Sequence, residues 1–474
     1  MLYRIGRTFF NRYPTLMTGL VGSIAKRVPL AVRHGAEYRA TRRLLEKSQW
    51  WSREQLEAYQ FQELKKTVEH AYRVSPFYRD HYGRAGVTPD RLRSLDDIRR
   101  FPTVCKDDLR EHLDRMIDPS VDRRTLIDFC TGGTTGPGVV IPFEESYRNR
   151  SRAFMWHLWE RVGYRPNMLA AILQHRDCPA DMNDGIWYMD KPSNAVVLSA
   201  HRLNTRTVDR YVEALREHRP RVLIAYPSLA YLFASYLKQI GFHEKLFDLV
   251  ILGSETLYEF QRKALEEVFQ APVRIHYGHI ESCTLFGYCE HSNVYHVQME
   301  YGFSEFLKDD GNVAGPGEVG EVVATNFANR ALPLVRYRTG DLAQPAAGRC
   351  DCGRQYPLVD QIIGRKGDFI RTPSGATHSP ILIEFLMDRI LLDGRDRFAD
   401  LQIVQSAIDQ LVVRVVPGAD YHAEDVENFC RLLDEELAGE VRVTHETVTE
   451  IPRTDRQKKS LVVSQLEPPP DEIQ

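Results

Sequence analysis

A glycine- and threonine-rich stretch is the part of this sequence best suited to chemistry. It reads Thr131-Gly132-Gly133-Thr134-Thr135-Gly136-Pro137-Gly138 and stands between two short apolar stretches, 126–130 and 139–143. Because glycine weakens helices and strands and the stretch has no period, it predicts a loop between two strands. Backbone N–H groups in such a loop can approach a phosphate closely, and threonine hydroxyls add further donors. The stretch therefore indicates a phosphate-binding loop, although on its own it would more simply be a plain hairpin turn.

Cysteine and histidine side chains form a second candidate group. Cys350 and Cys352 are separated by one residue in a predicted turn, and further cysteine and histidine residues precede them in the chain. Three thiolates and one imidazole hold zinc in tetrahedral geometry. The set that fits such a site is Cys289, His296, Cys350 and Cys352. His291 is an alternative fourth ligand, and Cys283 is a less favoured substitute. One residue between two cysteines is a less specific spacing than two, so side chains that bind no metal are the competing interpretation.

Length and composition limit the classes of protein to which the chain can belong. Its 474 residues exceed one ordinary core, so at least two domains are expected, and 43% hydrophobic with 27% charged residues is typical of a globular protein. A net charge of -3 gives no electrostatic argument for nucleic acid. Eight scattered cysteines do not form a secreted disulfide framework, and nothing at the start resembles a signal peptide, so a cytoplasmic location is predicted.

The order of the predicted elements indicates an α/β protein. Residues 34–118 are predicted to be helical, with a long amphipathic helix over 50–74. Over 169–277, short apolar strands alternate with helices, which predicts a largely parallel sheet whose ligand edge lies at the carboxyl ends of its strands. From 295 onward, strands and glycine turns predict a β-rich subdomain. Beyond the charged glycine segment 364–368, about a hundred residues form a predicted small α+β domain.

These elements lead to a prediction of the domain organisation. The predicted parts are a helical extension over 1–49, a large N-terminal domain over 50–364, a small α+β C-terminal domain over 365–466 and a disordered tail over 467–474. The moderately apolar stretch 15–25 ends at Lys26 and Arg27, well short of the about 20 residues that span a bilayer. We expect it to form an amphipathic helix that packs on the protein, and peripheral membrane contact is the less favoured alternative.

Six separated stretches carry a resemblance to a known family. They are Thr131–Gly136, Gly253-Ser254-Glu255, Tyr277-Gly278-His279-Ile280-Glu281, Tyr337-Arg338-Thr339-Gly340-Asp341, Gly364-Arg365-Lys366-Gly367-Asp368 and Pro452-Arg453-Thr454-Asp455-Arg456-Gln457-Lys458. Each is weak alone, but together and in this order they resemble the adenylate-forming (ANL) superfamily. Within it, the chain is similar to the phenylacetate–CoA ligase-like branch, which includes the CapK-like relatives of capsule biosynthesis. The resemblance covers residues 50–463, and 1–49 resembles an extension of the capsule-associated members.

The resemblance implies a role for each of these stretches. The loop over 131–136 would bind phosphate, and the adenine would lie against Gly253, Ser254 and Glu255, with Tyr277 and Gly278 adding to the nucleotide site. Glu281 would carry Mg²⁺, Asp341 would hold the ribose hydroxyls, and Arg365 would be catalytic. Asp368 would be the hinge of a mobile domain that brings Lys458 to the reaction. By position, Tyr226, Pro227 and His279 would line the pocket for the acid. Outside this context, Asp341 would be an ordinary turn residue, and Arg365 and Lys458 would be surface charges.

Three positions depart from the family pattern. Pro137 and Gly138 stand where the family usually has lysine and proline, so that lysine contact is missing. Ile280 replaces the threonine that bonds the α-phosphate, and Gln457 replaces the glycine before the terminal lysine. The loss of a hydroxyl at Ile280 is the most serious departure, because it would slow adenylation or mark a homologue with altered chemistry.

The chemistry that the resemblance implies has two steps. A carboxylate attacks the α-phosphorus of ATP, and a nucleophile then takes the acyl group from the adenylate. The implied cofactors are ATP, Mg²⁺ and CoA, with structural zinc between the β-rich subdomain and the loop after Glu281, and similar cysteine and histidine residues recur in this branch. The expected partner is a small carboxylic acid, aromatic by analogy alone. Three functions stay open: an acid–CoA ligase, a ligase that passes the acyl group to an amine, sugar or carrier, and a silent nucleotide-binding homologue. Nucleic acid is not expected, membrane contact is not favoured, and a homodimer is left open.

Overall fold

The structure is a computed structural model that describes residues 29–130, 139–174, 176, 178–378, 381–390, 396–453 and 458–466. It divides into two compact units. Unit 1 contains Arg27–Pro166 and His276–Ile362, and unit 2 contains Asn167–Ile275 and Ile363–Gln474. The predicted domain boundaries group the chain differently and stay predictions. The predicted phosphate loop at 131–138, the N-terminal stretch 15–25 and the tail at 467–474 lie outside the described residues.

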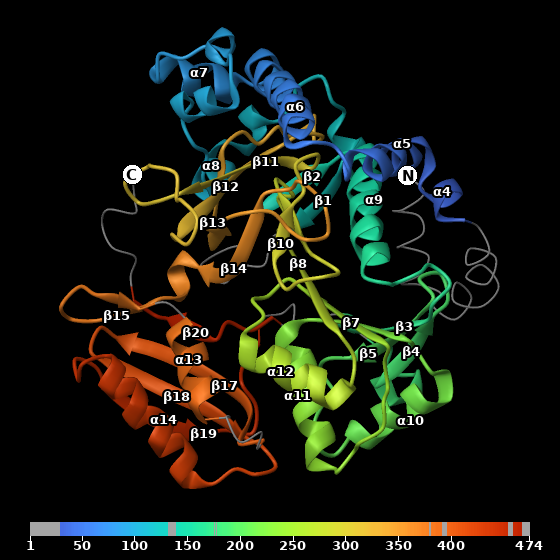
Figure 1. Cartoon of the computed structure of the whole chain (residues 1–474), viewed down its shortest axis with the longest axis vertical. Helices are drawn as coiled ribbons and strands as arrows, with labels where there is room; N and C mark the ends of the chain where they lie inside the picture. Colours follow the sequence, from blue (N-terminus) through green and yellow to red (C-terminus); the bar gives the residue numbers. More distant parts are fainter. Residues whose placement is uncertain are drawn as a thin grey trace. The chain divides into compact units, whose positions relative to one another are not determined.

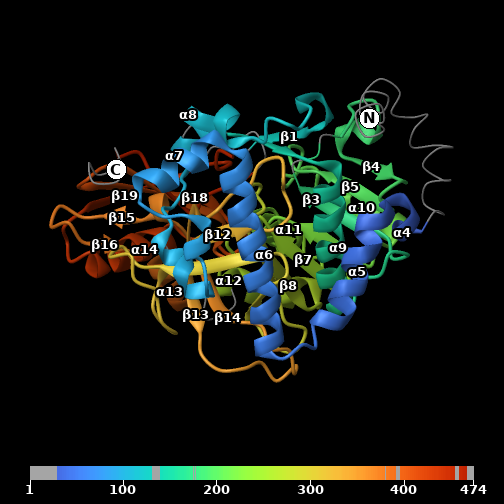
Figure 2. The same ribbon diagram turned by 90° about the horizontal axis from the view of Figure 1, so that it is seen from above.

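The N-terminal part of unit 1 is helical, as predicted. Its α-helices include α4 (Leu30–Arg33), α5 (Gly35–Ser48), α6 (Arg53–Val74), α7 (Pro76–Arg84), α8 (Lys106–Met116) and α9 (Glu145–Arg161), drawn in Figures 1 and 2. Helix α6 begins at a capping box, in which the Ser52 hydroxyl accepts from the Gln55 N–H and the Gln55 side chain accepts from the Ser52 N–H. Among the described residues, no helix is long and apolar enough to cross a membrane.

Helix α5 belongs to the region predicted as an extension, and it packs on α9. Leu45 is fully buried and shares a hydrophobic cluster with Phe154 and Leu158 of α9. Arg42 of α5 also forms an ion pair with Glu160 of α9. Because the apolar face of a helix must be covered, α5 is an integral layer of unit 1.

The sheet strands of unit 1 confirm the predicted β-rich region. They are β8 (Val273–Gly278, which begins in unit 2), β9 (Leu285–Tyr288), β10 (Tyr295–Val297), β11 (Gly302–Leu307), β12 (Gly320–Asn326), β13 (Tyr337–Ala346) and β14 (Leu358–Arg365, which ends in unit 2). Their order is β11-β12-β13-β14-β10-β9-β8. A separate antiparallel pair, β1 (Ile127–Cys130) and β2 (Val140–Phe143), flanks the glycine- and threonine-rich stretch. The two strands predicted on either side of that stretch are thus confirmed.

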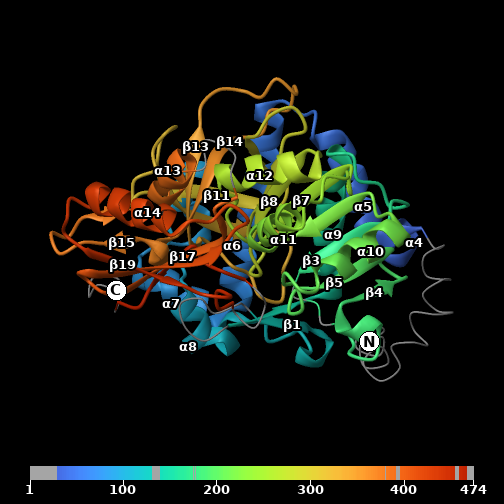
Figure 3. The ribbon, with the colours of Figure 1, turned by 90° about the horizontal axis from the view of Figure 1, so that it is seen from below.

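The first half of unit 2 contains the predicted parallel sheet. Its strands are β3 (Ala170–Gln174), β4 (Trp187–Asp190), β5 (Ala195–Ser199), β6 (Val222–Ala225) and β7 (Leu249–Gly253), in the order β7-β6-β3-β5-β4. Strands β7, β6, β3 and β5 are parallel, whereas the edge strand β4 is antiparallel and was not predicted. The helices are α10 (Val208–His218), α11 (Pro227–Gln239) and α12 (Glu259–Phe269). Figure 3 shows α10 beside β5, where the Tyr211 hydroxyl donates to the Ser199 carbonyl at 2.7 Å.

The second half of unit 2 is the predicted small α+β region. Strands β17 (Phe398–Ala407), β18 (Gln410–Pro417), β19 (Arg442–Thr447) and β20 (Val462–Ser464) form a sheet in the order β19-β18-β17-β20. Helices α13 (Ile381–Ile390) and α14 (Ala423–Glu436) accompany it, and β15 (Ile370–Arg371) pairs with β16 (Thr377–His378). Phe398, Ile403, Val413, Phe429 and Leu433 are fully buried in its core. The mixed α/β fold class predicted from the sequence is confirmed.

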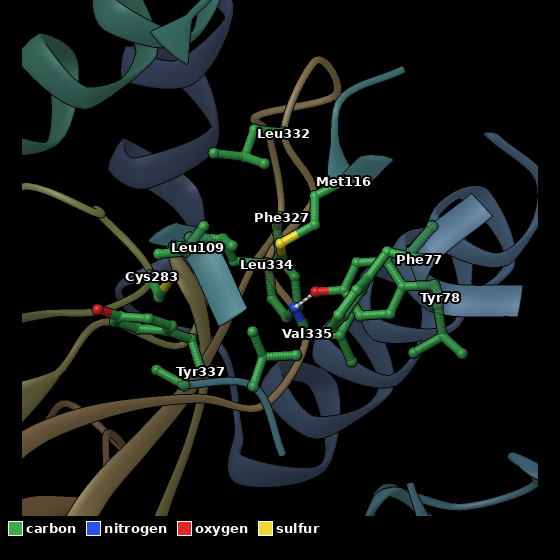
Figure 4. Packing of buried hydrophobic residues seen from close by; sticks show 14 of the residues in the cluster. Phe77, Tyr78, Leu109, Met116, Cys283, Phe327, Leu332, Leu334, Val335 and Tyr337 are labelled. Carbon is green, nitrogen blue, oxygen red and sulfur yellow. Dashed lines mark hydrogen bonds between the residues drawn. The ribbon is translucent and has the colours of Figure 1, made fainter. Parts of the chain in front are cut away.

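A large apolar core in unit 1 supports the segment after β8. Figure 4 shows Phe77, Tyr78, Met116 and Tyr337 in this core, where the Tyr78 hydroxyl accepts from the Val335 N–H at 2.9 Å. Burial raises the pKa of Tyr78, which keeps the phenol neutral. The Tyr337 ring is 1% exposed, so its hydroxyl is held in a fixed place by the packing around it.

Among the described glycines of unit 1, Gly302 is the one where a side chain has least room. A Cβ atom there would lie 2.0 Å from the Cys283 carbonyl oxygen and 2.6 Å from the Thr325 carbonyl oxygen. Because both atoms are backbone, Gly302→Ala is expected to destabilise the protein by about 1–3 kcal/mol or more, measured by thermal or urea unfolding. The matched control is Gly83→Ala in α7, where no atom lies within 4 Å. That change should be neutral or stabilise by up to about 1 kcal/mol, and equal unfolding of the two variants would contradict the close approach.

Candidate active site

Tyr277 and Asp341 bring together two of the motifs named above. Tyr277 lies in β8 and Asp341 in β13, and the Tyr277 hydroxyl donates to Asp341 Oδ2 at 2.8 Å across 64 residues of sequence. Gly340 has a φ of +73°, which favours glycine, and the Asp341 N–H donates to Thr339 Oγ1 at 3.1 Å. The side chain of the predicted ribose ligand is therefore positioned by the backbone of β13 and by the Tyr277 hydroxyl of β8.

Glu281, the predicted magnesium ligand, is held by two aromatic rings. Its Oε1 accepts from the Tyr337 hydroxyl at 2.8 Å, and its Oε2 lies 3.1 Å from His279 Nδ1. Its side chain is 12% exposed. Burial raises the pKa of Glu281, but the hydrogen bond and charge of His279 and the bond from Tyr337 outweigh it and lower that pKa to about 2. Glu281 is thus an ionised, oriented carboxylate at neutral pH, which suits a hard cation.

Ile280 and Ser282 form the turn around Glu281. Ile280 packs, partly buried, against the apolar core of unit 1, at the position where the family has a threonine. Ser282 has a φ of +54°, and its carbonyl accepts from the Tyr147 hydroxyl of α9 at 2.6 Å. The hydroxyl that the family pattern places here is therefore replaced by a side chain that anchors the turn to the core.

Glu255 follows β7 in unit 2 and is engaged by two backbone N–H groups. The preceding Ser254 has a φ of +73°, an unusual conformation for a residue with a side chain. Glu255 Oε2 accepts from the N–H of Ser228 at 3.0 Å, and Oε1 accepts from the N–H of Lys459 at 3.0 Å. Ser228 is in the first turn of α11, so a carboxylate there also benefits from the helix dipole. The predicted adenine turn thus ties α11 to the C-terminal lysine segment.

Lys458 and Lys459 are neighbours in the sequence with different surroundings. Lys458 Nζ lies 5.7 Å from the ring centroid of Tyr226, which precedes Pro227, the first residue of α11. The Lys459 ammonium forms an ion pair with Asp400 and donates to the Leu401 carbonyl at 2.9 Å. The Lys459 and Asp400 side chains are only 5% and 3% exposed. Lys459 is therefore a structural cation, whereas Lys458 lies beside a predicted acid-pocket residue.

Arg453 completes the polar group around Lys459. It donates to Asp400 Oδ2 at 2.9 Å and to the hydroxyl of Ser228 at 2.6 Å. Sequence reasoning missed Arg453, Asp400 and Lys459 as a group, because β17 and the segment before β20 are far apart in the chain. The first eight residues of β17 are all buried, so no alternation of polar and apolar residues could mark Asp400 as buried.

The predicted hinge lies at the end of β14. Arg365 is its last residue, Asp368 ends the short 3₁₀ turn Lys366–Asp368, and both are partly buried. Gly364 has a φ of +128°, a conformation that residues with a side chain rarely adopt. The structure therefore places a special backbone conformation where the sequence predicted a hinge, and the catalytic role of Arg365 stays a prediction.

The structure brings the four predicted zinc ligands together. Cys289 follows β9, His296 is in β10, and the other two lie between β13 and β14. All four ligand atoms lie within 4.8 Å of one another. The Cys350 and Cys289 sulfurs are 3.4 Å apart, and Cys352 Sγ is 3.9 Å from His296 Nε2. The edges of a tetrahedral zinc site are about 3.5–3.8 Å, given bonds of about 2.0–2.3 Å to nitrogen and sulfur. His291 and Cys283, the alternatives, are not in this group.

Charges beside the cysteines and histidine favour an anionic site. Glu290 accepts from Arg161 at 3.2 Å and from Arg354 at 2.6 Å, and the two arginine side chains are only 5% and 6% exposed. Nε and Nη1 of Arg161 are buried with no hydrogen-bond partner among the described residues. Two buried cations thus face one carboxylate, and this excess positive charge is costly unless anions offset it. Three thiolates on a divalent metal carry one net negative charge, so these residues fit a metal site.

His296 shows what metal binding would change. Burial and the nearby arginines lower its pKa to about 3, so the ring is neutral, as a metal ligand requires. Arg161 Nη2 lies 3.1 Å from Nδ1, which places the ring hydrogen on Nε2. A metal on Nε2 requires that hydrogen on Nδ1, so Arg161 would then donate to Glu290 alone. Sequence reasoning missed these charged residues, although Glu290 adjoins Cys289.

The comparison with known proteins agrees with the family resemblance of the motifs. No family model matches the chain. It is 22% identical to Protein CapK of Staphylococcus aureus over 466 residues, which covers 96% of this chain and 99% of CapK. It is 27% identical to the phenylacetate-coenzyme A ligase of Thermus thermophilus over 324 residues, and 25% identical to that of Escherichia coli over 326 residues. Each of these two alignments covers 67% of this chain and 72% of the ligase.

Solved structures show the same fold. A 2-hydroxyisobutyryl-CoA ligase in complex with an adenylate matches with a TM-score of 0.69 at 21% identity, covering 88% of this chain and 93% of the ligase. The anthranilate CoA ligase AuaEII in complex with anthranoyl-AMP matches with a TM-score of 0.50 at 16% identity, covering 72% and 66%.

Fold, motifs and relatives together support assignment of the chain to the adenylate-forming (ANL) superfamily. Within that superfamily, the assignment is to the phenylacetate–CoA ligase-like and CapK-like branch, as the sequence predicted.

Proposed function

We propose that the chain is an ATP-dependent acid–CoA ligase, which activates a carboxylic acid as an acyl-adenylate and transfers the acyl group to CoA. The observation that carries this proposal is the group formed by Tyr277, Asp341, Tyr337 and Glu281, in which hydrogen bonds of 2.8 Å join two motifs of the family. Relatives named phenylacetate-coenzyme A ligase support the same reaction.

Each residue of the proposed site has a separate role in adenylation. Bound Mg²⁺ neutralises phosphate charge, and Glu281 is the residue that would hold it. Asp341 accepts hydrogen bonds from the ribose hydroxyls and so orients the nucleotide. The Lys458 ammonium stabilises the negative charge that develops as the acid attacks the α-phosphorus. Glu255, with both oxygens engaged by backbone N–H groups, holds the segment that carries Lys458. The glycine- and threonine-rich stretch is proposed to bind phosphate.

A second acceptor class is supported by the extent of the CapK similarity. The CapK alignment covers 96% of this chain, whereas those with the phenylacetate ligases of Thermus and Escherichia each cover 67%. The chain therefore shares more of its length with CapK than with these CoA ligases. The alternative is transfer of the acyl group to an amine, a sugar or a carrier. We also propose a cytoplasmic location, from the cysteine pattern, and a homodimer stays open.

ATP–pyrophosphate exchange across aromatic, fatty and amino acids tests the proposal. Exchange that depends on one acid class would establish adenylation, and product analysis with CoA, amines and sugars would then identify the acceptor. ATP binding without exchange for any acid would overturn the enzyme proposal and favour the silent nucleotide-binding homologue. In that case the first variant to test is Ile280→Thr, which adds the hydroxyl that the family pattern has at this position.

We further propose that Cys289, His296, Cys350 and Cys352 bind structural zinc. Purified protein should contain close to one zinc per chain, and Cys350→Ser should lower that content to below about a tenth and reduce thermal stability. Cys178→Ser is the matched control, because Cys178 is a partly buried thiol outside the group. Metal analysis and thermal unfolding are the measurements. Wild-type protein without zinc, prepared without chelators, would contradict the site.

A further inference from the structure

Helix α5 exposes a row of basic side chains on the face opposite to its buried one. Arg39, Arg43 and Lys47 follow one another at intervals of four residues, so they lie one above the other along the helix. All three are exposed, and the exposed Ala36 and Ala40 lie on the same face. The buried face of α5 packs on α9, and Figure 2 shows the two helices side by side. The outer face of α5 is therefore basic, with small residues between the charges.

The basic row is not offset by carboxylates of the protein. Among the described residues, the ion pairs include that of Arg42 with Glu160 but none of the three cations in the row. Of the two acidic residues of α5, Glu46 is exposed and Glu37 is half-buried. Like charges four residues apart destabilise an isolated helix. The stability of α5 therefore gives no reason for this row of cations, whereas an anionic partner would.

The sequence before α5 is basic as well. Residues 1–36 contain six lysine or arginine residues and no aspartate or glutamate, whereas the whole chain has a net charge of -3. The six are Arg4, Arg7, Arg12, Lys26, Arg27 and Arg33. Phe9, Phe10 and the apolar stretch 15–25 stand between them in the sequence. Residues 1–28 lie outside the described residues and join the described chain at Pro29, directly before α4. Basic and apolar residues thus precede the exposed face of α5 directly.

Cations and apolar side chains next to one another fit the surface of an anionic lipid bilayer. Cations attract the anionic headgroups, and apolar side chains enter the boundary between headgroups and acyl chains. Val32 of α4 is 64% exposed and is followed by the exposed Arg33. Nucleic acid also attracts cations, but its phosphate backbone offers nothing to an exposed aliphatic side chain or to the apolar stretch 15–25. The composition therefore favours lipid over nucleic acid.

We infer that the exposed face of α4 and α5, together with the basic residues that precede it, binds the surface of an anionic membrane. The stretch 15–25 by itself left peripheral membrane contact the less favoured interpretation. The basic row on α5 and the absence of acidic residues from 1–36 are the observations that favour it. Membrane binding is independent of the proposed function, because none of these residues belongs to the candidate active site.

Sedimentation of the whole chain with lipid vesicles tests the inference. Vesicles of phosphatidylcholine mixed with phosphatidylglycerol are compared with vesicles of phosphatidylcholine alone. The protein is expected to bind the mixed vesicles at least about tenfold more tightly, since each lysine or arginine near an anionic surface raises the affinity by about fivefold. Raising the ionic strength from about 0.1 M to about 1 M should weaken this binding, because it shortens the Debye length from about 10 Å to about 3 Å. Equal binding to both kinds of vesicle, or to neither, would overturn the inference.

A triple variant of the basic row locates the binding surface. Arg39→Gln, Arg43→Gln and Lys47→Gln are combined, and the variant should bind the mixed vesicles at least about tenfold more weakly than wild type. Glutamine has a helix propensity similar to that of arginine and lysine, and the exchange removes like charges from one helix face. The melting temperature should therefore stay close to that of wild type or rise.

A second triple variant addresses the residues before α4. Arg4→Gln, Arg7→Gln and Arg12→Gln are combined in the whole chain, and they too should weaken binding to the mixed vesicles by about tenfold or more. This variant leaves α5 intact, so it decides the matter even if the α5 variant does not fold. Unchanged binding in either folded variant would overturn the inference for the residues concerned.

The matched control removes three exposed cations from α6, by Lys65→Gln, Lys66→Gln and Arg73→Gln. The net charge changes by the same amount, and vesicle binding should stay close to wild type. Equal weakening by the control and the α5 variant would overturn the inference, because net charge rather than this surface would then determine binding. A single-stranded oligonucleotide gives the last comparison. Oligonucleotide binding that the α5 variant loses, without vesicle binding by wild type, would overturn the inference in favour of nucleic acid.

Discussion

Replacement of Glu281 by glutamine is expected to lower acid-dependent ATP–pyrophosphate exchange by about 10²–10³-fold. The change removes one negative charge and keeps the shape, so a divalent cation loses its protein ligand. It also turns one oxygen into an NH₂ group, while the Tyr337 hydroxyl at 2.8 Å and His279 Nδ1 at 3.1 Å still face the two ends. One donor then faces another, which weakens the orientation of the group. A Mg²⁺ titration of the residual exchange should show a higher half-saturating concentration.

Glu300 offers a matched control in the same unit. It is fully buried, bonds to the hydroxyls of Ser48 and Tyr356, and has a pKa raised by burial, in contrast to the pKa of about 2 at Glu281. Glutamine resembles a protonated carboxyl group, so Glu300→Gln should keep exchange close to wild type. Equal exchange in the Glu281→Gln and wild-type proteins, at limiting Mg²⁺, would exclude Glu281 as the magnesium ligand.

The sequence was sufficient to predict the elements in which apolar residues recur with a clear pattern. Apolar runs with intervening helices predicted the parallel strands β3, β5, β6 and β7. The antiparallel edge strand β4 was missed, because its Trp187-Tyr188-Met189-Asp190 is too short and too mixed for a clear alternation. Periodicity reports which face of an element is buried, and a short edge strand gives little of that signal.

In the candidate site too, some residues could be predicted from the sequence and others could not. The family resemblance predicted Glu281 and Asp341, and the residue types predicted four zinc ligands, whose side chains the structure brings within 4.8 Å of one another. The partners of these residues come from elsewhere: Tyr337 reaches Glu281 across 56 residues, and Arg161 reaches Glu290 across 129. Such pairs leave no pattern in one sequence, since only the packing of the strands and helices determines them.

The two adjacent lysines are the sharpest example of what the sequence left undecided. Lys458 and Lys459 have equal side chains, and the motif alone chose the first. The structure gives a reason against the second: the Lys459 ammonium is paired with a buried Asp400. A cation already neutralised by a buried carboxylate is a poor partner for a developing phosphate charge.

Lys458→Ala is therefore expected to lower adenylation by about 10²–10³-fold and to change the melting temperature little. Acyl transfer to CoA from a synthetic acyl-adenylate should stay within a few-fold of wild type, since the ammonium acts on the phosphate in the first step only. The measurements are pyrophosphate exchange, the isolated second half-reaction and thermal unfolding. Loss of both half-reactions to the same degree would contradict a role confined to adenylation.

Lys459→Met is the matched change at the neighbouring position, and its main expected effect is a loss of stability. It keeps the aliphatic volume but removes one of the two cations that pair with the buried Asp400 among the described residues, which is expected to cost about 3–5 kcal/mol. The melting temperature should fall by roughly 5 °C or more. The Lys459 N–H that Glu255 accepts is retained, because it belongs to the backbone. If instead Lys459→Met abolished exchange at an unchanged melting temperature while Lys458→Ala kept it, the catalytic lysine would be Lys459, and the motif would be displaced by one residue.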